Sequence, residues 1–474
     1  MSKTITIEPV TRIEGHAKVT LRLDDAGNVA RARLHVNEFR GFEKFCEGRM
    51  FYEMPLITER ICGICPVSHH LVSAKACDEI LGIEPPRPAR LLRELMHMGQ
   101  IIQSHSMHFF ELAGPDLILG FDADPSIRNV AGLYEANRGL TLKAIALRKY
   151  GQEIIERLGE RRIHPEFAVP GGVTRALSVG NRDAMLAGVE TMIGHAQEGL
   201  AIMKSWMEEH AEDMDVFASF PSNYLGMVSE DNAVTLYEGA LRMVDPQRHP
   251  LERFDGHQYL DHIAERVEDW SYLKFPYHRK LGWPGGVYRV GPLGRLNTAE
   301  KISTPLAQKE FELFHRLGKG KTVEGSLYYH QARLIENLYA IERAHQLLEE
   351  PDILSTDIRT IARPSKREGV GVIEAPRGTL WHHYWVDEQG RLEKINLIVA
   401  TGNNNYAMSR AVEEVARHYV HGEPVKEGAL NRIEAAIRAY DPCLSCSTHA
   451  VGQMPLLVQV LGPDGSLLCQ VART

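Results

Sequence analysis

The sequence predicts a mainly α-helical fold with small antiparallel β-sheets, built as a single large α+β domain. Apolar residues recur at helical spacing through most of the middle of the chain. In contrast, apolar and polar residues alternate in short stretches near the N-terminus and after residue 368. With 474 residues, of which 44% are hydrophobic, the chain is long enough to bury a large core.

Period-two alternation predicts short strands within residues 3–9, 16–36 and 369–401. The third region is interrupted at residues 374–378. Because a proline cannot donate a hydrogen bond to a sheet, Pro376 predicts a sheet edge or a bulge at this point.

Helical periodicity predicts most of the remaining elements. Proline favours the first turn of a helix, and two predicted helices begin at Pro66 and Pro88. Residues 246–325 are looser and rich in glycine and proline, which predicts an irregular excursion over the surface. The predicted helices span residues 66–80, 88–112, 129–158, 182–213, 232–243, 326–350 and 428–440.

Charge and composition exclude several classes of partner. The formal charge is −8 with both signs interspersed, which gives no reason to expect nucleic acid or an anionic membrane surface. No apolar stretch is long enough to span a membrane, and no apolar leader opens the chain. Seven cysteines, four of them in CxxC pairs, indicate metal ligation in a reducing compartment, so we expect a cytoplasmic protein.

The two CxxC pairs are the strongest chemical signal. One lies in RICGIC at residues 60–65 and the other in DPCLSC at residues 441–446, about 380 positions later. Two such loops brought together offer four thiolates, which soft or borderline transition metals select. A structural zinc site is the alternative, but zinc modules usually hold both pairs within a few tens of residues. A metal site that joins both ends of a large chain indicates a catalytic site rather than a structural one.

RICGIC together with DPCLSCSTH resembles the paired cysteine motifs in the large, catalytic subunit of nickel-iron hydrogenases. The likeness runs from Arg12 to the last residues and is greatest to the cytoplasmic bidirectional, NAD-reducing type. It implies a long-helix bundle that catalyses reversible heterolytic cleavage of H2, with electrons passing through partner subunits to NAD(P)+. Deazaflavin- or viologen-type hydrogenases are the nearest alternatives, followed by a hydrogen sensor and a non-catalytic zinc scaffold.

The resemblance also implies the ligands of a Ni–Fe centre whose iron carries two cyanides and one carbon monoxide. Cys62 and Cys443 would bind nickel terminally, while Cys65 and Cys446 would bridge nickel and iron. The Cys443 thiolate or the Arg377 guanidine would act as the base. Because guanidinium normally stays charged, we give Arg377 mainly a positioning role. Glu14, in TRIEGH, would carry the proton onward.

Other residues are implied around this centre. A magnesium or other divalent ion would be bound by Glu43, the Leu397 carbonyl and His449. The residues expected beside the cluster are His69, Pro376, Thr401 and Asp441. Many members of the family have an aspartate where this chain has Ser104. The interpretation of the remaining candidates is that His70 is a surface residue and that Cys77 and Cys469 are not ligands, while Cys46 has no assigned role.

The implied partners follow from what the chain lacks. No cysteines are spare for iron–sulfur clusters, so a small subunit with an Fe–S cluster is expected, together with diaphorase subunits that hold FMN and further clusters. Nickel-insertion proteins and a maturation endopeptidase are expected as well. The endopeptidase would cut after His449, so residues 1–449 form the catalytic domain and residues 450–474 are an extension removed on maturation.

Overall fold

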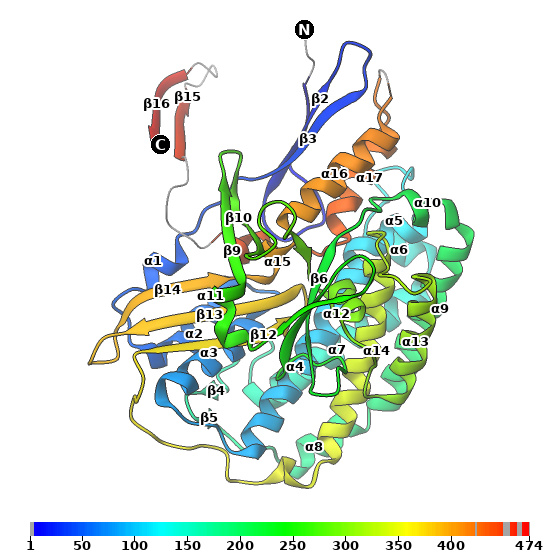
Figure 1. The fold of residues 1–474 in the computed structure, drawn as a ribbon. Coiled ribbons are helices and arrows are strands. Elements are labelled where there is room, and N and C mark those ends of the chain that lie inside the picture. Colours follow the sequence, from blue (N-terminus) through cyan, green and yellow to red (C-terminus); the bar gives the residue numbers. More distant parts are fainter. Residues whose placement is uncertain (1–3, 422–423, 449–455, 462–466, 474) are drawn as a thin grey trace.

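The computed structural model describes residues 4–421, 424–448, 456–461 and 467–473. Figure 1 shows most of the long helices gathered on one side of the molecule and most of the small sheets on the other. Among the described residues, no helix is long and apolar enough to cross a membrane. The long helices are α3 (Pro66–Leu81), α4 (Arg87–Ser106), α7 (Arg138–Gly159), α9 (Val189–Glu209), α13 (Pro305–Leu317), α14 (Tyr328–Glu349) and α16 (Asn405–Tyr419). This arrangement confirms the predicted mainly α fold.

Two buried helices form the centre of the helical layer. Most side chains of α4 and α14 are buried, as expected for helices packed on several sides. Helix α4 continues into a wider π-helical turn, η3 (Met107–Ala113), a feature often found beside functional sites. The shorter helices are α5 (Gly114–Leu119), α6 (Val130–Ala136), α8 (Val179–Leu186), α10 (Ala211–Val216) and α12 (Pro292–Thr298).

The predicted N-terminal sheet is confirmed. It contains β1 (Thr4–Ile7), β2 (Ala17–Leu23) and β3 (Val29–Val36) in antiparallel order. The link between β1 and β2 carries the TRIEGH segment, which runs beside the second cysteine pair. Gly15 adopts a φ of 84°, and a Cβ there would lie 2.8 Å from the Leu444 Cβ, so only glycine permits this approach.

The predicted strands after residue 368 are also confirmed. They form the sheet β12 (Glu368–Ala375), β13 (Gly378–Val386) and β14 (Leu392–Ile398). Pro376, however, lies at neither an edge nor a bulge. Ala375 pairs with Gly378, so Pro376 and Arg377 form the tight turn between β12 and β13. A turn accommodates a residue without an N–H group, and this one presents Arg377 to the cysteines.

Helix α3 packs directly against this sheet. A Cβ at Gly371 would lie 2.0 Å from the Val72 carbonyl oxygen, so the missing side chain lets α3 approach β12. The first cysteine pair lies at the N-terminus of α3 and is reached through α1 (Phe42–Cys46), η1 (Phe51–Glu53), α2 (Met54–Thr58) and η2 (Glu59–Ile61). Close packing of helix and sheet therefore fixes that pair relative to the Arg377 turn.

Two sequence predictions in the middle of the chain were wrong. Residues 232–243 form a loop and then a strand rather than a helix, and residues 246–325 are largely regular. Leu241 and Met243 alternate with partly exposed residues and pack with Leu225 and Met227 in a second small core. The elements are β6 (Asn223–Val228), β7 (Ala240–Val244), β8 (Pro250–Phe254), α11 (Tyr259–His262), β9 (Ile263–Glu268), β10 (Ser271–His278) and β11 (Tyr288–Arg289). A short pair, β4 (Ala168–Val169) and β5 (Gly172–Val173), lies against the helices.

The C-terminal part follows the prediction closely. Helix α17 (Glu427–Arg438) ends shortly before Pro442, and α15 (Ala400–Asn403) and α18 (Leu444–Ser447) are single turns. A hairpin follows the second cysteine pair and consists of β15 (Leu456–Leu461) and β16 (Leu467–Arg473), shown in red in Figure 1. The division at residue 449 stays a prediction.

Candidate metal centre

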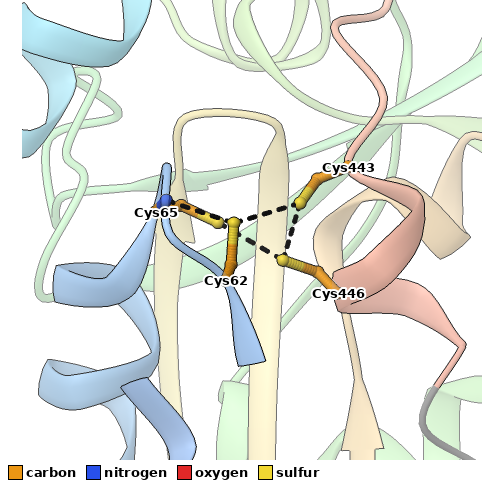
Figure 2. A group of neighbouring side chains, drawn as sticks. All are labelled: Cys62, Cys65, Cys443 and Cys446. Atoms are coloured by element: carbon orange, nitrogen blue, oxygen red, sulfur yellow. Dashed lines mark hydrogen bonds between the residues drawn. The ribbon is translucent and has the colours of Figure 1, made fainter. Parts of the chain in front are cut away.

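The four CxxC cysteines converge on one buried point. Cys62 follows η2 and Cys65 caps α3, while Cys443 and Cys446 come from α18 and the residue before it. Figure 2 shows the two pairs facing each other from opposite sides. The sulfur atoms lie within 4.8 Å of one another, with 3.4 Å between Cys62 and Cys443 and 3.4 Å between Cys65 and Cys446. All four side chains are buried.

The first cysteine loop is held by its own backbone and by helix α4. The N–H groups of Ile64 and Cys65 point at the Cys62 sulfur, at 3.2 and 3.4 Å. Gln100 and Gln103 each donate a side-chain N–H to the Ile64 carbonyl, at 3.0 and 2.7 Å. The sequence did not single out these glutamines, because a glutamine on a buried helix gives no local sign of its partner.

The electrostatics of the four thiols favour a bound cation. Hydrogen bonds with the other three thiols lower the pKa of Cys62 well below its ordinary value, whereas burial raises the pKa of Cys443 and Cys446 well above theirs. Four thiolates in a buried space repel one another and lose hydration, so they ionise together only when a positive ion compensates. A soft or borderline metal fits this donor set.

The Arg377 guanidinium reaches into the same space. Its Nε donates to the Asp441 carbonyl at 2.6 Å and its Nη2 donates to Asp441 Oδ1 at 3.0 Å. Its Nη1 is buried and has no hydrogen-bond partner among the described residues. Burial disfavours the charged form, but the negative charges of Asp441 and the thiolates prevail and raise the pKa of Arg377 well above its usual value. Arg377 therefore stays charged and has one free donor for a ligand.

A second buried arginine braces the turn that carries Arg377. Arg295 donates to the carbonyl oxygens of Ala375 and Pro376, at 2.9 and 3.2 Å. Its charge is balanced by Glu336, through both Nε and Nη2 at 2.6 Å, and by Glu374 at 2.7 Å. Arg295, Glu336 and Glu374 are fully buried, and sequence reasoning missed the group because its partners lie far apart along the chain.

Glu14 contacts the second cysteine pair directly. The Cys443 thiol lies 3.0 Å from Glu14 Oε2 and donates to it. The Ser445 backbone N–H also donates to Oε2 at 3.1 Å, and the Leu444 N–H donates to the Glu14 carbonyl at 3.0 Å. Glu14 is partly buried, so its carboxylate lies between the thiol and the outer part of the molecule.

The predicted residues of the divalent-ion site are only partly brought together. The Leu397 N–H donates to Glu43 Oε1 at 2.8 Å, which places these two residues side by side. Burial raises the pKa of Glu43 to about 7. His449 lies outside the described residues. Thr401 lies beside the second pair, where its hydroxyl oxygen accepts from the Cys443 N–H at 2.9 Å.

The histidines after the first pair are both buried. His69 lies one turn beyond Cys65 and its Nδ1 is 3.1 Å from His382 Nε2; burial lowers the pKa of His69 to about 4. The expectation that His70 is a surface residue was wrong. Its Nδ1 is 2.9 Å from the Pro55 carbonyl oxygen, and its Nε2 accepts from the Ala168 N–H at 2.7 Å. Helix α3 is covered on both sides, so it has no solvent face there.

The remaining candidates from the sequence lie away from the four sulfurs. The Cys77 thiol donates to the Phe51 carbonyl at 3.1 Å, and Cys46 is buried in α1. Ser104 is buried in α4. Neither Cys46 nor Cys77 belongs to the four-sulfur group, and that Cys77 is not a ligand stays a prediction.

Comparison with known proteins decides the family. A family model described as nickel-dependent hydrogenase matches residues 40–125 and 208–449, and one described as HoxL-like matches residues 4–39. The chain belongs to the nickel-dependent hydrogenase family.

Individual hydrogenases match over most or all of the chain. The β subunit of the NAD-reducing hydrogenase HoxS from Cupriavidus necator is 47% identical over 489 residues, covering 100% of both chains. The matching chain of the F420-non-reducing hydrogenase vhu from Methanococcus voltae is 46% identical over 416 residues, covering 87% of this chain and 98% of that one. A crystal structure of an NAD+-reducing NiFe hydrogenase in the H2-reduced state superposes with a TM-score of 0.92 at 43% identity, covering 94% of this chain and 99% of that one.

Membership in the nickel-dependent hydrogenase family confirms the resemblance on which the sequence analysis relied. It also favours nickel over structural zinc at the four cysteines, in keeping with their unusual separation along the chain. The individual roles of the site residues are a separate matter, and they are proposed below.

Proposed function

We propose that this chain is the catalytic subunit of a hydrogenase that cleaves H2 reversibly into protons and electrons, with the electrons leaving through partner subunits to NAD(P)+. One observation carries the proposal. Four buried thiols converge within 4.8 Å, and one of them, Cys443, is hydrogen-bonded to a carboxylate that can take a proton away.

The metal ligands follow the two cysteine pairs. Cys62 and Cys443 would hold nickel alone, and Cys65 and Cys446 would hold both nickel and an iron that carries two cyanides and one carbon monoxide. The convergence of all four sulfurs within 4.8 Å supports a centre held by these four residues. When bound, the centre supplies the Lewis acidity that polarises H2 and the capacity to take up its electrons.

Proton transfer is assigned to Cys443 and Glu14. Cys443 Sγ takes the proton released by cleavage and donates it to Glu14 Oε2, which lies 3.0 Å away. The Ser445 N–H group, at 3.1 Å from the same oxygen, keeps the carboxylate aimed at the thiol. Geometry of this kind is what a general acid–base pair needs, since the proton must move within hydrogen-bond reach.

Arg377 is assigned a positioning role rather than the role of base. Its raised pKa keeps the guanidinium charged, and its free Nη1 can donate to a diatomic ligand of iron. Asp441 holds the other two nitrogens in place. Pro376, Thr401 and His69 complete the surroundings, Pro376 through the turn and Thr401 through its contact with the Cys443 backbone.

A divalent ion, Mg2+ or a similar one, is assigned to Glu43, the Leu397 carbonyl and His449. The proximity of Glu43 and Leu397 supports this assignment. Carboxylate and carbonyl oxygens are the ligands that a hard cation prefers. Because burial raises the pKa of Glu43, a positive ion beside it would favour the ionised carboxylate.

Partner subunits are required because electrons must leave a buried site. We assign an iron–sulfur small subunit and diaphorase subunits with FMN and clusters to this role. Nickel-insertion proteins and a maturation endopeptidase are assigned to assembly of the centre. The segment leading to the first cysteine pair exposes four large apolar residues that could contact the small subunit: Phe39, Phe45, Tyr52 and Leu56.

The identity of the electron acceptor is the most specific part of the proposal. The NAD-reducing relative is 47% identical over the whole chain, whereas an F420-non-reducing relative that covers 98% of the chain is 42% identical. The higher identity over the full length therefore favours NAD(P)+ and a cytoplasmic enzyme. The viologen-type assignment is the closest competitor.

An infrared spectrum of the purified complex tests the centre, and an H2-dependent assay with NAD+, NADP+ and methyl viologen tests the acceptor. We expect carbonyl and cyanide bands together with one nickel ion per complex, and reduction of a pyridine nucleotide by H2. Absence of the bands with stoichiometric zinc bound to the four cysteines would refute the function. Reduction of methyl viologen alone would keep the hydrogenase assignment and refute the NAD(P)+ assignment.

A further inference from the structure

A second group of metal-binding side chains lies outside the four-cysteine site. Glu252 on β8, His262 at the end of α11 and His278 at the end of β10 place three ligand atoms within 4.8 Å of one another. His262 Nδ1 is 2.8 Å and His278 Nε2 is 2.6 Å from the same carboxylate oxygen, Glu252 Oε2. Nothing in the proposed hydrogenase reaction uses these residues.

The backbone holds the two histidines in place. His262 and His278 lie at the open end of the β9–β10 hairpin, where His278 pairs with Ile263. The Arg279 N–H donates to the His262 carbonyl at 2.6 Å, and the His278 N–H donates to the Gly286 carbonyl at 2.8 Å. The backbone hydrogen bonds therefore hold both histidines together at the open end of the hairpin.

Packing also fixes the ring planes. The Phe254 ring stacks on the His262 imidazole, with 4.0 Å between centroids and 15° between planes. Glu252 lies two residues before Phe254 on the same strand, so the carboxylate and the stacking ring are supplied together. A preformed arrangement of this kind reduces the ordering that a bound ion would otherwise require.

The exposure of the group suits a small ion from solvent. The side chains of Glu252, His262 and His278 are 14%, 13% and 4% exposed, so the group is sheltered without being sealed. The His262, His278 and Lys280 side chains all face the Glu252 carboxylate.

Lys280 is the competing cation. Its ammonium pairs with the other carboxylate oxygen, Glu252 Oε1, and its side chain is 67% exposed. An exposed lysine can leave for water at small cost, since exposed ion pairs contribute little to stability. Lys280 thus weakens binding of a cation without blocking it.

We propose that Glu252, His262 and His278 form a binding site for one divalent cation of the zinc class. Two imidazole nitrogens and one carboxylate oxygen are the protein ligands found in many mononuclear zinc sites, where water fills the fourth position. Each imidazole would present a lone pair to the ion and keep its proton on the other ring nitrogen.

The ion would tie the hairpin to the neighbouring sheet. Figure 1 shows β9 and β10, in green, as a projecting hairpin with α11 at its base. A two-stranded hairpin is only marginally stable by itself. A cross-link from its open end to β8 anchors it where it leaves the body of the protein, which is the role of a structural metal.

Zinc titration of the purified hydrogenase complex tests the proposal. After treatment with a chelator, the complex is titrated with Zn2+ in competition with a chromophoric chelator. We expect one site in the wild-type protein with a Kd below micromolar. His262→Gln and His278→Gln should weaken it by more than about 100-fold, because loss of an outer partner alone costs about 10–100-fold. His257→Gln is the matched control, since His257 is an exposed histidine nearby that contacts Asp255 instead.

Two further readouts separate this site from the four cysteines. Zinc X-ray absorption should show nitrogen and oxygen ligands only, and retained nickel in His262→Gln and His278→Gln reports that these variants fold. Lys280→Gln should bind zinc more tightly than the wild type. Sulfur-bound zinc, wild-type affinity in both histidine variants, or no wild-type binding below micromolar would overturn the proposal, and each result is independent of the infrared test of the Ni–Fe centre.

Discussion

The Cys443 thiol lies 3.0 Å from Glu14 Oε2, although 429 positions separate the two residues along the chain. The contact is made by two short backbone segments that pair in parallel, Glu14 beside Cys443, with Gly15 permitting their approach. The N-terminal and C-terminal parts of the chain therefore meet at the contact that we assign to proton transfer from the four-cysteine site.

Replacing Glu14 by glutamine keeps the size of the side chain but removes its capacity to carry a proton. We expect H2 oxidation to fall by about 10²–10⁴-fold, the usual contribution of a positioned acid–base group. Nickel content and the infrared bands should persist, because the ligands are untouched. Glu8→Gln, at an exposed position after β1, is the control and should keep full activity. Loss of nickel from the Glu14 variant would assign Glu14 a structural role instead.

Replacing any one of Cys62, Cys65, Cys443 or Cys446 by serine should abolish nickel retention and all H2-dependent activity. A hydroxyl is a hard, neutral donor and substitutes poorly for a thiolate at nickel or iron. Metal analysis of the purified complex measures the loss. Cys46→Ala removes a buried thiol from outside the group and should keep nickel. Full activity in any one of the four serine variants would contradict the ligand assignment.

Replacing Arg295 by methionine should destabilise the metal-free chain by about 3–5 kcal/mol, because Glu336 and Glu374 would remain buried without their partner. Urea denaturation measures the change. The turn that presents Arg377 would also lose two hydrogen bonds, so activity should fall even where the chain still folds. Arg367→Met is the control: that arginine pairs with Glu388 at the surface, and its loss should cost no more than about 1 kcal/mol. Equal effects of the two variants would rule out the bracing role.

Glu43 should make the metal-free chain less stable as pH rises. Burial raises the pKa of Glu43 to about 7 from 4.5, so between these values the folded chain holds a proton that the unfolded chain has lost. The stabilisation from the neutral form is present below pH 4.5 and disappears as pH rises through about 7. Glu43→Gln should therefore stabilise the metal-free chain more at pH 8 than at pH 5, as measured by thermal midpoints. Glu47→Gln, on the exposed side of the same segment, should show no such difference. If Glu43→Gln changed the thermal midpoint by the same amount at pH 5 and at pH 8, this would contradict the burial of an ionised carboxylate.

The parts of the fold that the sequence predicted are those with a local signal. Alternation in residues 369–401 identified β12 to β14, and proline at Pro66 and Pro88 marked the starts of α3 and α4. The sheet that contains β6 and β7 was missed because the alternation of Leu241 and Met243 covers only a few residues and adjoins a loop with helical spacing. Short strands beside irregular segments give too few periods to recognise.

The residues of the candidate site also divide into those that the sequence predicted and those that it could not predict. Cys62, Cys65, Cys443 and Cys446 could be found because equal spacing and donor chemistry are written in the sequence. Arg295, Gln100 and Gln103 could not, because their function is to satisfy backbone carbonyls that only the folded chain brings near them. His70 was misassigned for a related reason: its environment is set by segments on both sides of α3, not by its neighbours in sequence.

The C-terminal extension should be absent from active enzyme. The segment after Cys446 is buried as far as Thr448, whose carbonyl accepts the Arg40 N–H at 2.8 Å. The four sulfurs converge in the chain that still carries the β15–β16 hairpin, so the extension does not keep the cysteines apart. Its effect is at His449: while residues 450–474 are attached, the polar backbone continues past this residue, and each polar group buried there without a partner would cost roughly 2–7 kcal/mol.

Cleavage between His449 and Ala450 would remove this obstacle and leave His449 free to bind the divalent ion from the end of the chain. Mass spectrometry of active enzyme should therefore show a large chain that ends at His449. A chain stopped at His449 should become active without the endopeptidase, whereas one stopped at Leu461 should still need it, because it keeps the bond that is cut. Active enzyme that retains residues 450–474 would show that the extension is compatible with a closed site, and maturation would then need a different physical basis.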